Sequence, residues 1–120
     1  MIEIIQGLPP HVAAFNATGK VTEVDYIDTI NPLVAQIEKK FGRISYLLVI
    51  HTPLKNYSVG AWIKDALLGL KYFMKWNRIA IVAEKKGIKE FTDFFGVLIP
   101  AKTKGFMMED INAAKQWVSE

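Results

Sequence analysis

The chain has 120 residues, of which 51% are hydrophobic and 22% are charged, and its formal net charge is +3. This length predicts one domain, residues 1–120, whose core is large enough to fold without disulfides or structural metals. The absence of cysteine excludes disulfide bonds, thiolate metal sites and cysteine nucleophiles. Because the modest positive charge comes with no recognition motif, the sequence argues against nucleic acid as a partner.

The first two predicted elements are short strands. Residues 1–5 alternate weakly and are rich in isoleucine, which indicates an edge strand before the turn at residues 7–10. Residues 12–17, VAAFNA, predict a second strand. The short connection between the two favours antiparallel pairing.

A helix is predicted over residues 23–41. Thr22 followed by Asp25 is the aspartate version of a capping box, and Gly42 closes the helix. Pro32 lies inside this segment, so we expect a kink or a break near Ile30. The expected buried face follows spacings of three and four residues and consists of Ile27, Ile30, Val34, Ile37 and Phe41.

Two near-continuous apolar runs, residues 45–51 and 78–84, predict central strands that are covered on both sides. Residues 103–107 predict an edge strand, and residues 109–118 predict a closing helix. Because strands alternate with helices after the first two, neighbouring strands should be parallel. The predicted fold class is therefore α/β, a mixed five-stranded sheet with an antiparallel first strand and about four helices.

The most informative stretch is residues 58–78, SVGAWIKDALLGLKYFMKWNR, which predict a helix capped by Ser58. Placed 100° apart, its apolar residues cover an arc of roughly 180°, more than packing on one sheet requires. A narrow stripe of lysines, Lys64, Lys71 and Lys75, lies beside this arc, and Asp65 falls on the polar side. Tryptophans and a basic stripe on a wide apolar face are typical of a helix that lies in a membrane interface.

A further helix is predicted over residues 88–99, again with a wide apolar face. If the surplus apolar surfaces of this helix and of residues 58–78 face each other, they enclose a cavity suited to an acyl chain. If the surplus is exposed instead, it forms a patch that drives contact with a membrane or a second copy. The residues predicted to bind a nonpolar ligand are Trp62, Leu70, Phe73, Met74, Phe91, Phe94 and Phe95. Those predicted to contact an anionic membrane surface are Lys64, Lys71, Lys75 and Trp76.

The segment order NATGKVTEVDY, then SYLLVIHTPLKNYSVGAW, then RIAIVAEKKGIKEF resembles the SpoIIAA-like family of small bacterial proteins. That family is related in fold to STAS domains and to CRAL-TRIO lipid carriers. The resemblance covers nearly the whole chain and implies a right-handed β/α superhelix with an antiparallel first strand. For this branch of the family it also implies membrane association and carriage of nonpolar ligands through the second and third helices.

Sporulation anti-anti-sigma factors, another branch, carry Asp-Ser-Ser-Gly before this helix, and their second serine is phosphorylated. The corresponding residues here are Tyr57, Ser58, Val59 and Gly60. Since a valine stands at the phosphorylated position, the usual phosphoserine switch is not implied. Ser58 accepts phosphate only if the alignment slips by one residue.

Candidate catalytic residues are few. His51 ends a strand at the edge where open α/β sheets bind ligands, and Ser58 stands at the mouth of the next helix. The two residue types suit a general base and a nucleophile, but the Gly-x-Ser-x-Gly elbow is absent. No metal or cofactor is expected, because two distant histidines and scattered carboxylates do not make a ligand set.

The leading hypothesis is a cytoplasmic protein, peripheral on the inner face of the cell membrane, that binds a nonpolar or lipid-like ligand. The first alternative is an anti-anti-sigma-like regulator that uses the same helix face against a protein partner or a second copy. The second alternative is an interfacially activated hydrolase that uses His51 and Ser58.

Overall fold

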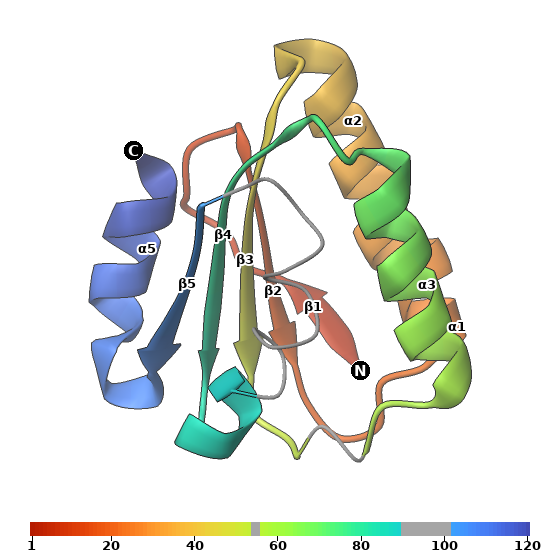
Figure 1. Ribbon diagram of the computed structural model, residues 1–120, viewed down its shortest axis with the longest axis vertical. Coiled ribbons are helices and arrows are strands. Elements are labelled where there is room, and N and C mark those ends of the chain that lie inside the picture. Colours follow the sequence, from red (N-terminus) through yellow and green to blue (C-terminus); the bar gives the residue numbers. More distant parts are fainter. Residues whose placement is uncertain (54–55, 90–101) are drawn as a thin grey trace.

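The computed structural model describes residues 1–53, 56–89 and 102–120, and of Val59, Trp62 and Ile63 it describes the backbone only. Its centre is a five-stranded sheet in the order β1-β2-β3-β4-β5 (Figure 1). The strands are Ile2–Ile4 (β1), Val12–Ala17 (β2), Ile44–Ile50 (β3), Trp76–Ala83 (β4) and Lys102–Met107 (β5). β1 pairs antiparallel with β2, and each later pair is parallel. The predicted mixed α/β sheet with an antiparallel first strand is therefore confirmed.

Helices cover both faces of the sheet (Figure 1). They are Glu23–Asp25 (α1), Asn31–Phe41 (α2), Val59–Lys71 (α3) and Ile111–Ser119 (α5), with a π-helical turn at Tyr26–Ile30 (η1) and a 3₁₀ turn at Met108–Asp110 (η3). Because alternate residues of a strand point to opposite faces, β3 contributes to two cores. Tyr46 and Leu48 join the larger core on the side of α2 and α3, whereas Leu47 and Val49 join the smaller core on the side of α5. This double coverage explains why β3 is buried along its whole length, as its sequence predicted.

The helix predicted over residues 23–41 is one helical segment with a π-helical turn in its first half. The Asn31 N–H donates to the Tyr26 carbonyl, five residues back, and Pro32 follows directly. Since proline has no N–H and its ring crowds the preceding turn, regular α-helical bonding is interrupted here. The predicted break near Ile30 is therefore confirmed.

The buried face of this segment differs from the prediction at both ends. Its three central residues are buried as expected, but Ile27 and Phe41 are exposed. The wide turn of η1 rotates the start of the segment, so that Tyr26 is buried in place of Ile27. Phe41 is the last residue of α2, where the helix passes the beginning of β3.

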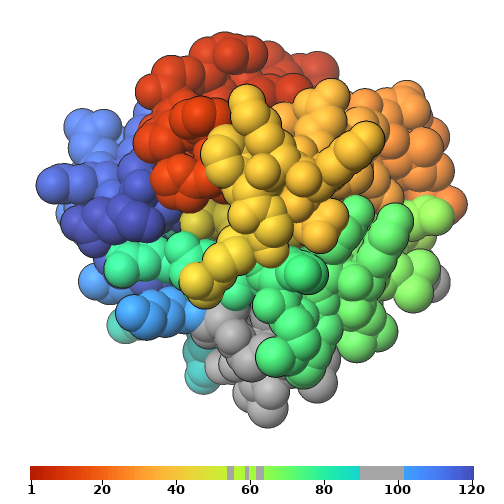
Figure 2. Space-filling model, turned by 90° about the horizontal axis from the view of Figure 1, so that it is seen from above, coloured from red at the N-terminus to blue at the C-terminus, as the bar shows by residue number. Residues whose placement is uncertain are grey.

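α3 is shorter than the helix predicted over residues 58–78, because the chain leaves the helix after Lys71 and enters β4 at Trp76. The Trp76 indole N–H donates to the Gly69 carbonyl at 3.2 Å, and the Ile44 N–H donates to the Lys75 carbonyl at 2.8 Å. The second bond ties the turn after α3 (green) to the turn after α2 (yellow), and the two lie side by side (Figure 2). The placement of Trp76 on a helix facing a membrane was therefore wrong, since its side chain is only 6% exposed.

The strand predicted over residues 103–107 and the helix predicted over residues 109–118 are both confirmed. Arg78 fastens the end of α5 to β4: its guanidinium donates to the Trp117 carbonyl at 2.8 Å and lies 3.0 Å from the Glu120 carboxylate. Residues 85–89 are helical, and the remainder of the helix predicted over residues 88–99 lies outside the described residues. None of the described helices has the length and apolarity that crossing a membrane requires.

Candidate functional site

Helix α3 and the turn after it expose large apolar side chains to solvent. Leu67, Leu70 and Met74 expose 53%, 64% and 76% of their surface, and Phe73 exposes 39%. We refer to these four side chains as the outer face of α3. The outer face is therefore a candidate contact site for a protein or a membrane, because removing exposed apolar surface from water is favourable.

The predicted membrane-contacting lysines differ in how much charge they present. Lys71 and Lys75 are exposed beside the outer face, and the Lys71 ammonium lies 5.4 Å from the centre of the Tyr72 ring. Lys64 is partly covered, and its ammonium lies 3.9 Å from the Glu23 carboxylate of α1. The positive charge next to the outer face therefore comes mainly from the end of α3 and the turn that follows.

The residues predicted to line a ligand pocket fall into two groups. Leu70, Phe73 and Met74 lie on the outer face of α3. The others fall outside the described part of the chain, and they are the side chain of Trp62 together with Phe91, Phe94 and Phe95. A pocket between α3 and residues 88–99 therefore stays a prediction.

The inner face of α3 carries a carboxylate. Ala61, Asp65 and Leu68 are buried, and Asp65 is only 7% exposed. Its Oδ1 accepts a hydrogen bond of 2.8 Å from the Tyr26 hydroxyl of η1. The sequence prediction placed Asp65 on the polar side of the helix, so α3 is rotated about its axis relative to that prediction. Leu67 and Leu70 point outward, whereas Asp65 points inward.

Two local contacts set this rotation. The Ser58 Oγ accepts the Ala61 N–H at 3.0 Å, which caps the first turn of α3 as predicted. Gly60 faces α1 closely enough that a Cβ there would lie 2.8 Å from the Glu23 Oε2. Because only glycine permits this approach, α1 packs on one side of α3 and the neighbouring residues Ala61 and Asp65 turn toward the core.

Three buried tyrosines lie in the interior beside Asp65, and burial changes the pKa values of all four side chains. Burial raises the pKa of Asp65 to about 7, against the hydrogen bond from Tyr26, which lowers it. Burial, followed by the charge of Asp65, raises the pKa values of Tyr26, Tyr46 and Tyr57 above their usual range. The Tyr46 hydroxyl has no hydrogen-bond partner among the described residues. Near pH 7 about half of the Asp65 side chains are therefore protonated and neutral, and the hydroxyls of the three neighbouring tyrosines are neutral as well.

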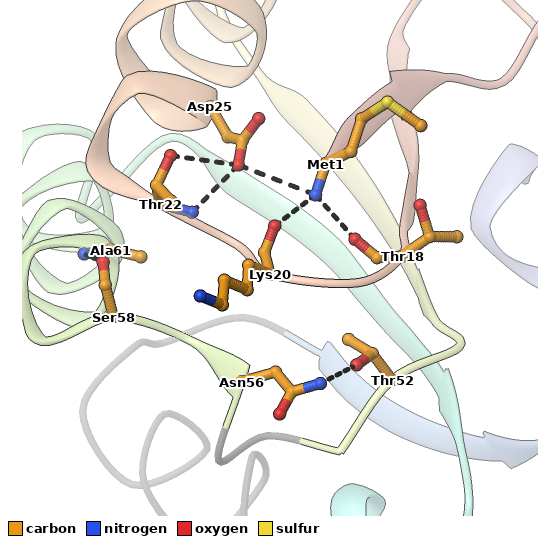
Figure 3. Close-up of polar contacts among 9 residues, drawn as sticks. All are labelled: Met1, Thr18, Lys20, Thr22, Asp25, Thr52, Asn56, Ser58 and Ala61. Carbon is orange, nitrogen blue, oxygen red and sulfur yellow. Dashed lines mark hydrogen bonds and ion pairs between the residues drawn. The ribbon is translucent and has the colours of Figure 1, made fainter.

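The predicted catalytic candidates lie at the carboxyl edge of the sheet, His51 directly after β3 and Ser58 at the start of α3. Polar side chains hold the loops of this edge together, as Figure 3 shows for Thr52 and Asn56. The Asn56 side chain donates to the Thr52 Oγ1 at 2.7 Å, and the His51 Nε2 lies 3.0 Å from the Asn16 Oδ1. No hydrogen bond joins His51 to Ser58 in the described ranges. The structure therefore does not bring them together as a nucleophile and its base.

The same edge holds the beginning of the chain and of α1 (Figure 3). The Met1 ammonium donates to the carbonyls of Thr18 and Lys20 and lies 3.8 Å from the Asp25 carboxylate. Asp25 also accepts the Thr22 N–H at 2.8 Å, which confirms the predicted capping box. Across the residues that the structure describes, no three histidine or acidic side chains are grouped as a metal ion would require.

Comparison with known proteins agrees with this architecture. The SpoIIAA-like family matches residues 12–119. An uncharacterized protein from Shewanella loihica with a SpoIIAA-like fold, known from a crystal structure, is 26% identical, with a TM-score of 0.73 over 98% of this chain and 92% of that chain. A comparison with curated proteins gives no match. Because the family match spans most of the chain, the protein belongs to the SpoIIAA-like family, and the resemblance seen in the sequence is confirmed.

Proposed function

We propose that this protein attaches reversibly to anionic membrane surfaces through the outer face of α3, as a peripheral protein on the inner face of the cell membrane. The observation that carries the proposal is the rotation of α3. Leu67, Leu70 and Met74 are exposed, although the same helix keeps Asp65 inside. A helix that only covered a sheet would gain stability from the opposite rotation.

The energies suit reversible attachment. Full burial of one Leu, Met or Phe side chain contributes about 1.5–3 kcal/mol, so partial insertion of four contributes several kcal/mol. Each exposed lysine near an anionic surface adds about 1 kcal/mol. This total is on the scale of a single fatty-acyl anchor, which binds membranes only marginally and reversibly.

Carriage of a nonpolar ligand is the second part of the proposal and rests on the sequence. It requires residues 88–99 to supply a second apolar wall opposite α3. Native mass spectrometry of protein purified from its own host tests it directly. A bound acyl or isoprenoid mass supports carriage, whereas protein without such a species leaves membrane attachment as the only proposed activity.

Vesicle flotation tests the attachment. Vesicles that contain phosphatidylglycerol should carry the wild-type protein upward, and vesicles of phosphatidylcholine alone should carry much less. The variant Leu67→Gln/Leu70→Gln should lose most of this binding. Ile4→Gln/Val24→Gln is the matched control, because both residues are exposed aliphatics that lie on β1 and α1. Equal flotation of the two variants would contradict a role for the outer face.

Membership of the SpoIIAA-like family favours a second candidate, a regulator that binds a protein partner or a second copy with the same face. The residue that corresponds to the phosphorylated serine of the sporulation anti-anti-sigma factors is Val59 here, and Ser58 is engaged as the helix cap, so this regulator would lack the usual switch. A protein that co-purifies stoichiometrically without lipid would favour this candidate. Light scattering of the purified chain distinguishes a second copy from a different partner.

A further inference from the structure

A second exposed turn lies at the same end of the molecule as the turn after α3. It consists of residues 39–43, KKFGR, at the end of α2, and the side chains of Lys39, Lys40, Phe41 and Arg43 are all exposed. Phe41 was predicted to be buried and instead exposes 42% of its surface. We call residues 39–43 the α2 turn and residues 71–75, KYFMK, the α3 turn.

The two turns form one surface. The Ile44 N–H, just after the α2 turn, donates to the Lys75 carbonyl at 2.8 Å. The Arg43 guanidinium donates to the Asn77 Oδ1 at 3.0 Å, just after the α3 turn. Seen from above the amino end of the sheet, the yellow α2 turn and the green α3 turn are adjacent (Figure 2). Neither turn belongs to the carboxyl edge that holds His51 and Ser58.

The combined surface is basic and apolar. Its basic residues are Lys39, Lys40, Arg43, Lys71 and Lys75, and neither segment contains an acidic residue. Within the described ranges, no carboxylate forms a salt bridge with any of these cations. The exposed apolar side chains between them are Phe41, Phe73 and Met74, with Leu70 one turn back on α3.

Resting on the membrane attachment proposed above, we infer that the α2 turn and the α3 turn together form a basic, aromatic tip that binds the phosphates of anionic phospholipids. The protein then stands with the amino end of its sheet toward the membrane and its carboxyl edge toward solvent. Cations reach the headgroup phosphates while Phe41, Phe73 and Met74 enter the interface beneath them. The tip therefore complements the phospholipid surface both in charge and in polarity.

A phospholipid surface fits this tip better than other anionic partners. A nucleic acid would neutralise the cations, but its phosphate backbone offers no apolar medium for Met74, the most exposed apolar side chain of the tip, or for Leu70 beside it. A lipid interface supplies phosphate and hydrocarbon within a few ångströms of each other. The tip presents cations and apolar side chains over a similarly short range.

The test is vesicle binding by the charge-reversal variant Lys39→Glu/Lys40→Glu. Since each cation near an anionic surface contributes about a factor of five in affinity, loss of two predicts that binding to phosphatidylglycerol vesicles weakens by about 25-fold or more. The matched control is Lys20→Glu/Lys85→Glu, which changes the net charge equally at exposed positions outside the two turns. Lys39→Gln/Lys40→Gln provides a milder variant if charge reversal lowers the melting temperature.

The outcomes separate this inference from the proposal on which it rests. A large loss in the α2-turn variants with little change in the control supports the tip. Equal binding by all variants overturns the tip while leaving attachment through α3 in place. Failure of the wild-type protein to bind the vesicles overturns both. Tighter binding of the wild type to a single-stranded oligonucleotide than to vesicles overturns the assignment to phospholipid.

Discussion

Because Asp65, the buried carboxylate of α3, has a raised pKa, the stability of the protein should depend on pH. Asp65→Asn removes the charge and keeps an oxygen that accepts the hydrogen bond from Tyr26. The pKa of Asp65 is raised from 3.8 to about 7 in the folded protein. A difference of about three pK units, at about 1.36 kcal/mol each, corresponds to about 4 kcal/mol of unfolding free energy.

The sign follows from which state holds the proton. Between about pH 4 and pH 7 the folded protein keeps the Asp65 proton and the unfolded chain releases it, so stability falls as the pH rises through this range. Above pH 7 the folded protein carries the full cost of a buried charge. Asp65→Asn should therefore be more stable than wild type at pH 8, by up to about 4 kcal/mol, and nearly equal to it at pH 4.

Urea denaturation at pH 4, 5, 6, 7 and 8 measures this difference, provided that the slope with denaturant is unchanged. Asp28→Asn is the control, because Asp28 is an exposed carboxylate on η1 and its replacement should change stability by less than about 0.5 kcal/mol. If the Asp65 variant were less stable than wild type at pH 8, or if its advantage did not depend on pH, the account of the inner face would be wrong.

Two further predictions concern packing around the sheet. Tyr26→Phe removes the donor to Asp65 and should destabilise the protein by about 1.5–3 kcal/mol at pH 8 and by less at pH 5. In urea denaturation the loss should be smaller in the Asp65→Asn background, about 0.5–1.5 kcal/mol, because the hydroxyl then donates to a neutral amide oxygen. Gly105→Ala should cost about 1–3 kcal/mol, because its Cβ would lie 2.1 Å from the Cγ2 of Ile88, a β-branched side chain that cannot rotate away freely. Combining it with Ile88→Ala should relieve part of that cost in a thermal melt, and full additivity would contradict the contact.

The strands and the order of elements were predictable because hydrophobic runs of strand length have few alternative explanations. β3 is the clearest case, since seven consecutive buried residues require cover on both faces. The interruption by Pro32 was equally visible, because its cause is local and covalent. The π-helical form of that interruption was not visible, and it placed Tyr26 rather than Ile27 in the core.

The end and the rotation of α3 were not predictable from periodicity alone. Phe73 and Trp76 continue the apolar arc of the helix, yet the chain leaves the helix after Lys71. Beyond that point the Lys75 carbonyl accepts the N–H of Ile44, which lies far away in the sequence. A signal for the true inner face was present in the row Ala61, Asp65, Leu68 and Tyr72, at spacings of four, three and four. The sequence prediction did not follow this row, because the side chains on the outer face of α3 are larger and more apolar and were expected to be the buried ones.

Exposure of the α2 turn also escaped the sequence prediction. Phe41 continues the buried spacing of its helix, and only the structure shows that α2 ends beside the start of β3. Two basic segments about thirty residues apart become neighbours because β3 and β4 are adjacent parallel strands that begin at the same end of the sheet. Such proximity follows from topology rather than from local pattern.

Membrane attachment through the outer face of α3 is tested most directly by measuring the depth of single labelled residues. Because the chain contains no cysteine, Met74→Cys and Ile4→Cys each provide one site for an environment-sensitive fluorophore. On vesicles with phosphatidylglycerol, a label at residue 74 should shift to shorter wavelength and be quenched by lipids that carry a nitroxide in the acyl chain, whereas a label at residue 4 should show neither change. Identical responses at both positions, or no response at residue 74 while the protein is bound, would contradict the account.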